Sequence, residues 1–161
     1  MNWFATLRAI ALGIAILAVG ACESTTNNTD AVNTEPATPG SERDFIVNVG
    51  DRVFFLTDTS SLTDTAMETL RRQAAWLKQY PSVRIQVEGH ADERGTREYN
   101  IALSARRGNA TKAVLVSQGI DPSRVDTIAY GKERPVATCD AESCWSQNRR
   151  AVTLITSGAQ S

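Results

Sequence analysis

The fold of this chain is decided by the stretch Gly89-His-Ala-Asp-Glu-Arg-Gly-Thr-Arg-Glu-Tyr-Asn-Ile-Ala-Leu-Ser-Ala-Arg-Arg107. Its first part is a polar loop that carries the carboxylate of Asp92, and its second part has a helical pattern that carries Arg106 and Arg107. Successive helical residues point about 100° apart, so only one of the two arginines can face the loop. A protein carboxylate opposite a guanidinium can bind a zwitterionic ligand. The protein carboxylate pairs with the ligand's ammonium, and the guanidinium donates two hydrogen bonds to the ligand's carboxylate.

The segments before this stretch predict two strands and a helix. An apolar strand is expected through Val53–Phe55, and the apolar run 45–49 leaves room for a shorter strand before it. Thr63 or Asp64 can cap a helix that ends at Pro81. The next run is a half-buried strand, since its apolar residues alternate with polar ones: Val83, Ile85 and Val87.

The second helix is expected from about Arg97 to Gln118, followed by Gly119 as its stop signal. Its apolar residues predict the buried face: Ala102, Leu103, Ala110, Ala113 and Val114. Strands are expected over 125–130 and 148–156, joined by a long connection that has room for a short helix, with a frayed tail over 158–161. The order strand–helix–strand–helix–strand–strand predicts an α/β (α+β) domain over 44–157, with a mixed sheet and two main helices packed on it.

The bulk composition fits one ordinary domain. The chain has 161 residues with 42% hydrophobic content, which is enough for a core. The formal net charge is −1, so there is no general electrostatic case for binding nucleic acid.

The first 43 residues read as a targeting segment and a tether. Residues 1–21 combine Arg8 with an apolar run that is too short for a confident membrane span, as in a secretory signal peptide. The end of that run, Val19-Gly20-Ala21-Cys22, resembles a bacterial lipobox, which implies lipidation of Cys22; a plain signal peptide with an incidental cysteine is the alternative. Residues 22–43 are rich in Ser, Thr, Asn, Pro and Gly, so a flexible tether is expected, or an ordinary disordered terminus.

Several motifs lie in the same order as in a known family. The segment 89–107 resembles the signature of the OmpA-like peptidoglycan-binding domain family, and so do the runs Val53-Phe-Phe55, Ala129-Tyr-Gly-Lys-Glu-Arg-Pro135 and Asn148-Arg-Arg150. The resemblance spans roughly residues 44 to 156. It implies the βαβαββ sandwich of that family, an outer-membrane lipoprotein with its domain in the periplasm, and binding of peptidoglycan.

The resemblance also implies a ligand and a site. The ligand would be the diaminopimelate of the peptidoglycan stem peptide, with Asp92 receiving its ammonium and Arg107 its carboxylate. A structural salt bridge or an exposed loop charge is the alternative for these two residues. The rest of the pocket would come from backbone groups of the first loop and from two helical side chains: Phe55, Leu56, Thr57, Asn100 and Leu103.

Other polar residues near this stretch have less direct roles. His90 is expected to be structural, and Glu93 and Arg94 to be solvated loop charges that a protein partner could touch. Asn148, Arg149 and Arg150 are expected to frame the pocket from the last strand.

One position departs from the family pattern. The family usually has aspartate directly after the aromatic pair of the first loop, where this chain has Leu56, followed by Thr57 and Asp58. Any role of that aspartate side chain is missing here, whereas backbone donors survive the change.

The chain has three cysteines, of which Cys139 and Cys144 remain after Cys22. An exported protein can form a disulfide between them. The alternatives are free thiols or a metal site with His90, but two cysteines and one histidine fall short of the usual four zinc ligands.

The resemblance implies a binding protein without cofactors rather than an enzyme. Ser104 lies on the helix with no base and orienting acid assembled around it. A periplasmic hydrolase using His90, Asp92 and Glu93 is one rival. The other is an adaptor that binds only protein, since in this family the wall-binding face overlaps the face for the Tol-system β-propeller TolB. The combined expectation is a lipid-anchored tie between outer membrane and cell wall that supports envelope integrity and constriction at division.

Overall fold

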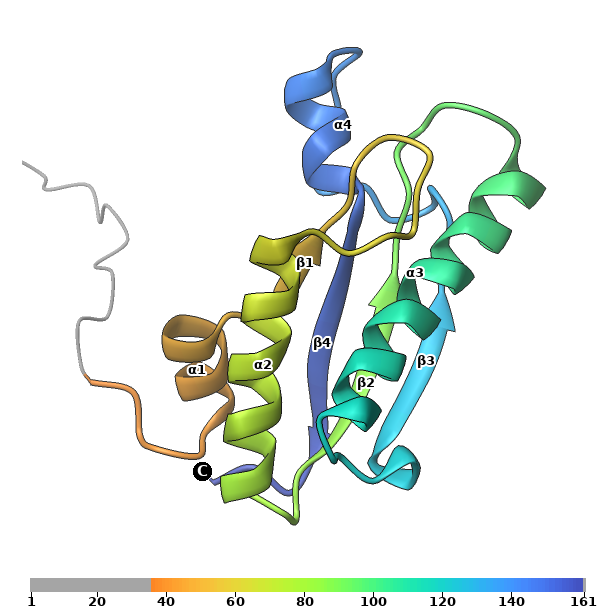
Figure 1. The fold of residues 1–161 in the computed structure, drawn as a ribbon. Coiled ribbons are helices and arrows are strands. Elements are labelled where there is room, and N and C mark those ends of the chain that lie inside the picture. The colour runs from red at the N-terminus through yellow and green to blue at the C-terminus, as the bar shows by residue number, and fades with distance from the viewer. Residues whose placement is uncertain (1–35, 161) are drawn as a thin grey trace, which may run out of the picture. The chain divides into compact units, whose positions relative to one another are not determined.

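The computed structural model describes residues 36–160, which form a four-stranded sheet with helices against it (Figure 1). The predicted signal peptide, the lipidation of Cys22 and most of the tether lie outside these residues. Within residues 36–160, no helix is long and apolar enough to cross a membrane.

The sheet is mixed, with strand order β1-β4-β2-β3. The strands are β1 (Arg52–Phe54), β2 (Arg84–Gly89), β3 (Val125–Ala129) and β4 (Arg150–Ser157). β2 and β3 are parallel, whereas β4 runs antiparallel to both β1 and β2. The predicted mixed sheet and its order of elements are confirmed.

Two long helices, α2 (Asp64–Gln79) and α3 (Arg97–Ser117), cover the same face of the sheet (Figure 1). Each begins at a threonine whose hydroxyl accepts from the third following N–H: Thr63 from Ala66, at 3.2 Å, and Thr96 from Tyr99, also at 3.2 Å. α3 provides the crossover between the parallel strands β2 and β3.

The remaining helical segments are short. They are α1 (Glu42–Asp44), the π-helical turn η1 (Phe45–Val49), the 3-10 turn η2 (Pro122–Arg124) and α4 (Glu142–Asn148). α4 is the short helix for which the connection after β3 had room. The run 45–49 is helical rather than a strand, because it buries Phe45 against Trp76, with ring centroids 4.9 Å apart, and leaves Ile46 and Val47 exposed.

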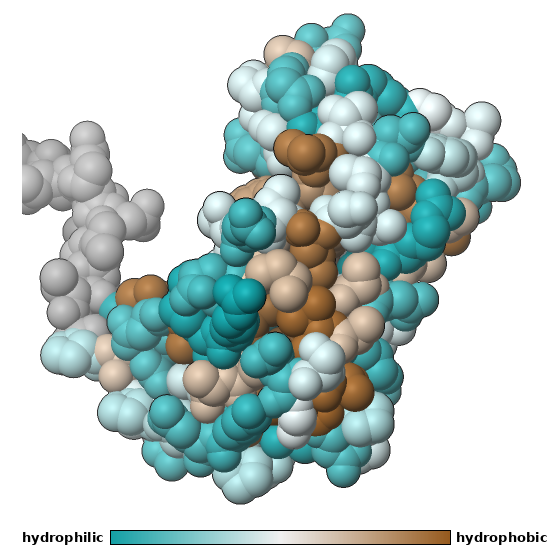
Figure 2. All heavy atoms as spheres, in the orientation of Figure 1, coloured by the Kyte–Doolittle hydropathy of each residue, from teal (hydrophilic) through white to brown (hydrophobic). Residues whose placement is uncertain are grey.

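The hydrophobic core lies between α2, the end of α3 and the sheet. Leu70 and Leu77 of α2 and Ile85 and Val87 of β2 are completely buried in it. On the molecular surface, hydrophobic residues are exposed between α2 and α3, with hydrophilic residues on both sides of them (Figure 2).

The buried face of α3 differs from the one predicted. Leu103 and Leu115 are buried, but Ala102 and Ala113 are exposed, and the rest of the buried face is polar or small: Asn100, Ser104, Arg107, Gly108 and Thr111. This face is buried despite its polarity because its groups are hydrogen-bonded; the Ser104 hydroxyl, for example, accepts from Gly131 N–H at 2.9 Å.

The helix approaches β2 most closely at Gly89. A Cβ on Gly89 would lie 1.9 Å from the backbone oxygen of Ser104, so only glycine fits this position. The contact places the end of β2, and the loop that follows it, directly beside the first turns of α3.

The folded part extends slightly beyond the predicted limits of 44 and 157. Gln160 donates from its N–H to the carbonyl of Gly40 at 3.0 Å, and Ser41 forms a parallel bridge with Gln160. Gln160 is therefore paired with the start of the domain, within the segment 158–161 for which the sequence predicted a frayed tail.

Candidate functional site

The loop after β2 is held by side chains from two other segments. Asn100 Nδ2 of α3 donates to the carbonyl of Arg94 at 2.8 Å. Lys132 Nζ donates to the carbonyls of Glu93 and Gly95 at 3.0 and 2.8 Å. These bonds fix the loop backbone without using any side-chain group of Asp92.

A polar pocket of about 430 Å³ opens between this loop, the loop after β1 and the start of α3. Of the predicted site residues, Asp92, Thr57, Asn100 and Leu103 line it. Four further residues complete its lining: Asp58, Arg94, Gly95 and Tyr99.

Asp92 carries bonds from two arginines, although it is only 7% exposed. The Nη2 of Arg94 lies 2.6 Å from Oδ2, and the backbone N–H and Nε of Arg94 both lie 3.2 Å from Oδ1. Arg149 Nη1 lies 3.2 Å from Oδ2. Burial raises the pKa of Asp92, but the hydrogen bonds from Arg94 and Arg149 outweigh it and hold the pKa below its ordinary value. Asp92 is therefore an anion at neutral pH.

Arg107 is completely buried and does not line the pocket. Its guanidinium donates to the carbonyls of Thr59, His90 and Leu56, at 2.9, 2.9 and 3.2 Å. Three of its five N–H groups are used in this way. Burial lowers the pKa of Arg107 to about 10, so it remains a cation at neutral pH. Arg106, in contrast, is exposed, with its guanidinium 6.0 Å from the Tyr99 ring centroid. The two arginines thus point to different surroundings, and Arg107 is the one that faces the loop.

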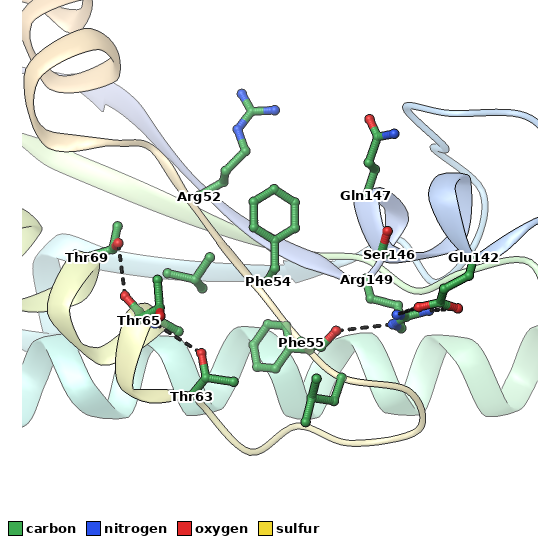
Figure 3. A pocket seen from close by; sticks show the side chains of 13 residues that line it. Arg52, Phe54, Phe55, Thr63, Thr65, Thr69, Glu142, Ser146, Gln147 and Arg149 are labelled. Carbon is green, nitrogen blue, oxygen red and sulfur yellow. Dashed lines mark hydrogen bonds and ion pairs between the residues drawn. The ribbon is translucent and has the colours of Figure 1, made fainter.

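The predicted first-loop residues are divided between two places. Thr57 lines the pocket beside Asp92, and the Leu56 carbonyl accepts from Arg107. The side chains of Phe55 and Leu56 line a second hollow of about 630 Å³, whose other lining residues come from β1, the start of α2 and α4 (Figure 3). Leu56 is 64% exposed there. The Leu56 side chain therefore does not line the Asp92 pocket, and its backbone carbonyl is the part of this residue that bonds Arg107.

His90 has a structural environment. Its ring is 2% exposed and stacks on Tyr130, with centroids 5.5 Å apart. Its backbone N–H donates to the Arg150 carbonyl at 2.9 Å, while its own carbonyl accepts from Arg107. Burial, with the nearby charges of Arg150 and Arg134, lowers the pKa of His90 to about 4, so the ring is neutral at neutral pH.

The three residues before and at the start of β4 have different roles. Arg149 is outside the pocket lining, but it contacts Asp92 and also donates to the carbonyl of Phe55 at 3.1 Å. Asn148 instead bonds the backbone of Val136 and Ala137. Arg150 donates to the carbonyl of Arg134 at 3.1 Å.

Glu93 and Arg94 are exposed, but they are not simply solvated charges. The Trp145 indole N–H donates to Glu93 Oε1 at 2.9 Å, and the guanidinium of Arg94 lies 4.3 Å from the Trp145 ring centroid. Trp145 belongs to α4, and the sequence contained no signal that α4 would return to the Asp92 loop.

Asp58 and Tyr99 were not predicted as site residues. Asp58 adopts a positive φ of 55°, and its carboxylate accepts a bond from the Tyr99 hydroxyl. It gives the pocket a second carboxylate, two positions after Leu56. The sequence offered one clue, since aspartate is among the few residues that tolerate this backbone conformation.

The predicted disulfide between Cys139 and Cys144 is present. It lies at the N-terminal end of α4, with Cα atoms 5.6 Å apart. Cys139 is exposed and Cys144 is half-buried, so the disulfide lies at the surface, in the segment that leads into α4.

Comparisons with known proteins identify the family of this chain. The OmpA family model matches residues 54–149. The chain belongs to the OmpA family. Its curated relatives include the peptidoglycan-associated lipoprotein of Agrobacterium fabrum, which is 66% identical over 119 residues, covering 74% of this chain and 67% of the relative. The lipoprotein of the same name from Mesorhizobium japonicum is 59% identical over 153 residues, covering 92% and 90%.

Solved structures show the same fold. The crystal structure of the peptidoglycan-associated lipoprotein from Burkholderia pseudomallei matches with a TM-score of 0.68 and 33% identity, covering 72% of this chain and 100% of that one. The C-terminal domain of Helicobacter pylori MotB has a TM-score of 0.63 at 23% identity, covering 66% and 84%, and shares the fold alone. These relatives carry the name of a peptidoglycan-associated lipoprotein, which describes association with the cell wall and not an enzyme activity, and this chain shares their OmpA-type domain.

Proposed function

We propose that this chain binds the diaminopimelate of peptidoglycan in the Asp92 pocket and ties the outer membrane to the cell wall. The observation that carries the proposal is the pocket itself, in which an ionised carboxylate, Asp92, lies at the end of β2 beside the buried cation Arg107. The names of the relatives support peptidoglycan as the partner.

The ammonium of the ligand would bind at Oδ1 of Asp92. The two bonds that Oδ1 accepts, both from Arg94, are 3.2 Å long, whereas Oδ2 accepts the shortest bond of this carboxylate, 2.6 Å from Nη2 of Arg94. Arg149 and Nη2 of Arg94 would continue to hold Oδ2. Asp58, the second carboxylate on the pocket wall, adds to the negative potential that favours an ammonium.

The carboxylate of the ligand would be taken by the two N–H groups of Arg107 that the protein leaves unused. Because Arg107 is buried, the loop after β1 has to move for the ligand to reach it. The Thr59 and Leu56 carbonyls in that loop are the acceptors that such a movement would release.

Lipidation of Cys22 would hold the domain at the outer membrane, since several acyl chains at about 0.8 kcal/mol per buried CH₂ give lasting anchoring. Residues 22–43 would serve as the tether between lipid and domain. Binding at one site can be weak, because many anchored copies facing one polymer gain by multivalency. We place the protein in the Tol-Pal system, with TolB as a competing partner, acting in envelope integrity and in constriction at division.

The test is sedimentation of the soluble domain, residues 36–161, with purified sacculi. This part is a suitable unit because it contains the whole core, and the Burkholderia structure corresponds to 72% of the chain. Sacculi with diaminopimelate should retain the domain, whereas sacculi with lysine at that position, which lack the second carboxylate, should retain much less. Equal retention by both would rule out recognition of the zwitterion, and no retention by either would leave the protein-only adaptor.

A further inference from the structure

The short helix α4 begins without a capping side chain. It has seven residues, and its N-cap, Ala141, offers no side-chain hydrogen bond to the first turn. Short helices of this kind are marginal by themselves, because nucleation is costly. The disulfide supplies a covalent substitute, since it joins Cys144 in the first turn to Cys139 before the helix.

The turn that the disulfide closes presents two side chains toward the candidate site. Glu142 and Trp145 are three residues apart, so they project from the same face of the helix. The Glu142 carboxylate pairs with the guanidinium of Arg149, as Figure 3 shows. Trp145 stacks under the guanidinium of Arg94 and donates to Glu93.

Both of these arginines donate to the same carboxylate, that of Asp92. Arg149 and Arg94 are the two side chains that donate to Asp92. Each of them therefore has one contact on Asp92 and another on the first turn of α4, Arg149 with Glu142 and Arg94 with Trp145 directly after Cys144. Arg149 is only 5% exposed, and its additional bond to the carbonyl of Phe55 fixes it from the β1 side.

We infer that the Cys139–Cys144 disulfide is a positioning device for the Asp92 carboxylate, acting through Glu142 and Trp145 on the two arginines that hold Asp92. The disulfide does not itself contact the pocket, and it contributes nothing to the core, which contains no residue of α4. Its effect is to restrict two long side chains, and through them the orientation of Asp92. An effect of the disulfide on wall binding rests on the function proposed above, whereas its effect on the orientation of Asp92 does not.

The decisive measurement is the titration of Asp92 in the domain with Cys139→Ala and Cys144→Ala together. Carboxyl NMR shifts would be followed against pH in this variant and in the native domain. The two arginine contacts keep the pKa of Asp92 low. Weakening these contacts should therefore raise the midpoint of the Asp92 titration toward the ordinary value of about 3.9. Asp121 is an internal control, since its carboxylate accepts from Ser123 N–H and has no contact with α4; its midpoint should not change.

An unchanged Asp92 midpoint in the double variant would overturn the inference, and so would an equal change at Asp121, which would indicate general loosening of the fold. Trp145 offers a second route that leaves the disulfide intact. Trp145→Ala should raise the Asp92 midpoint, whereas Trp145→Phe, which keeps a ring under Arg94, should restore most of the native value. Equal midpoints in the two variants would contradict a role of the stacked ring.

Wall binding is measured separately on the same proteins. The disulfide variant should bind diaminopimelate sacculi about three- to tenfold more weakly, which is the cost of ordering about one long side chain on binding. If the native domain fails to bind sacculi at all, the proposed function fails, while the Asp92 titration still decides the positioning. If the native and variant domains bind equally although the Asp92 midpoint has changed, the disulfide positions the carboxylate without serving this ligand, and the inferred role in binding is wrong.

Discussion

The guanidinium of Arg107 donates to the backbone carbonyl of His90 at 2.9 Å, two residues before Asp92. Arg107, the cation of the proposed diaminopimelate site, is thus hydrogen-bonded to the same loop that carries the anion Asp92. Since Arg107 also supports the loop after β1, through Leu56 and Thr59, it has a structural role even when no ligand is bound.

Replacing Arg107 should therefore destabilise the domain. Arg107→Ala leaves three carbonyls without their donor, and at 1–3 kcal/mol for an unpaired buried group we expect a loss of about 3 kcal/mol or more in the free energy of unfolding. Urea denaturation measures this loss. Arg106→Ala is the matched control, because Arg106 is exposed and should cost less than about 0.5 kcal/mol. Similar losses in the two variants would contradict the burial of Arg107.

Buried His90 should make stability depend on pH. The pKa of His90 is about 4 in the folded protein and 6.5 as an ordinary histidine, so between these values the unfolded state binds the proton and the folded state does not. Stability should then fall as the pH drops from 6.5 to 4, by about 2 to 3 kcal/mol from this residue. The Glu88 carboxylate, 3.5 Å from His90 Nε2, acts in the opposite direction and limits the effect.

The measurement is urea denaturation at several pH values, for the native domain and for His90→Phe. The variant keeps a ring beside Tyr130 but cannot titrate, so the difference between the two proteins isolates His90 from the carboxylates that titrate in the same range. A difference that stays constant from pH 7 to pH 4 would show that His90 has an ordinary pKa.

Two glycines should respond oppositely to alanine. In Gly89→Ala the new Cβ would lie 1.9 Å from the Ser104 backbone oxygen, so strand and helix must separate, at a cost of about 1–3 kcal/mol or more. At Gly108, on the same helix contact, the nearest atoms would be 3.8 Å away. Gly108→Ala should be neutral or stabilising by up to about 1 kcal/mol, the helix propensity that glycine forfeits. Thermal denaturation of both variants would reveal whether the two changes have the same sign.

The side chain of Leu56 should not matter for wall binding. It is 64% exposed and lines the hollow between β1, α2 and α4, while its carbonyl accepts a hydrogen bond from Arg107. We expect Leu56→Ala to bind diaminopimelate sacculi within about twofold of the native domain, since surface changes away from a site rarely exceed 0.5 kcal/mol. A large loss would mean that the ligand reaches the second hollow as well.

The sequence predicted those elements whose pattern was local. The alternation of Val83, Ile85 and Val87 specified β2, and the capping residue Thr63 specified the start of α2. In the same way, the spacing of Arg106 and Arg107 correctly implied that only one of them faces the loop.

What could not be predicted depends on contacts between distant segments. α3 buries Asn100, Ser104 and Thr111 because each finds a hydrogen-bond partner, whereas apolar periodicity favoured its alanines. Nothing local shows that Trp145 lies under Arg94, 51 residues earlier in the chain, or that Arg149 reaches Asp92. The assignment of Asp92 and Arg107 to diaminopimelate came from the family resemblance and stays a prediction.

The central claim is that the Asp92 charge binds the ligand, and the most direct measurement is the affinity of Asp92→Asn for diaminopimelate sacculi. Asparagine keeps the shape of the side chain and removes its charge. A lost charged hydrogen bond costs about 1.5–3 kcal/mol, so the affinity should fall by about ten- to a hundredfold. Asp126→Asn, an exposed carboxylate on β3, is the control and should bind like the native domain. Native affinity in a folded Asp92→Asn domain would contradict the account.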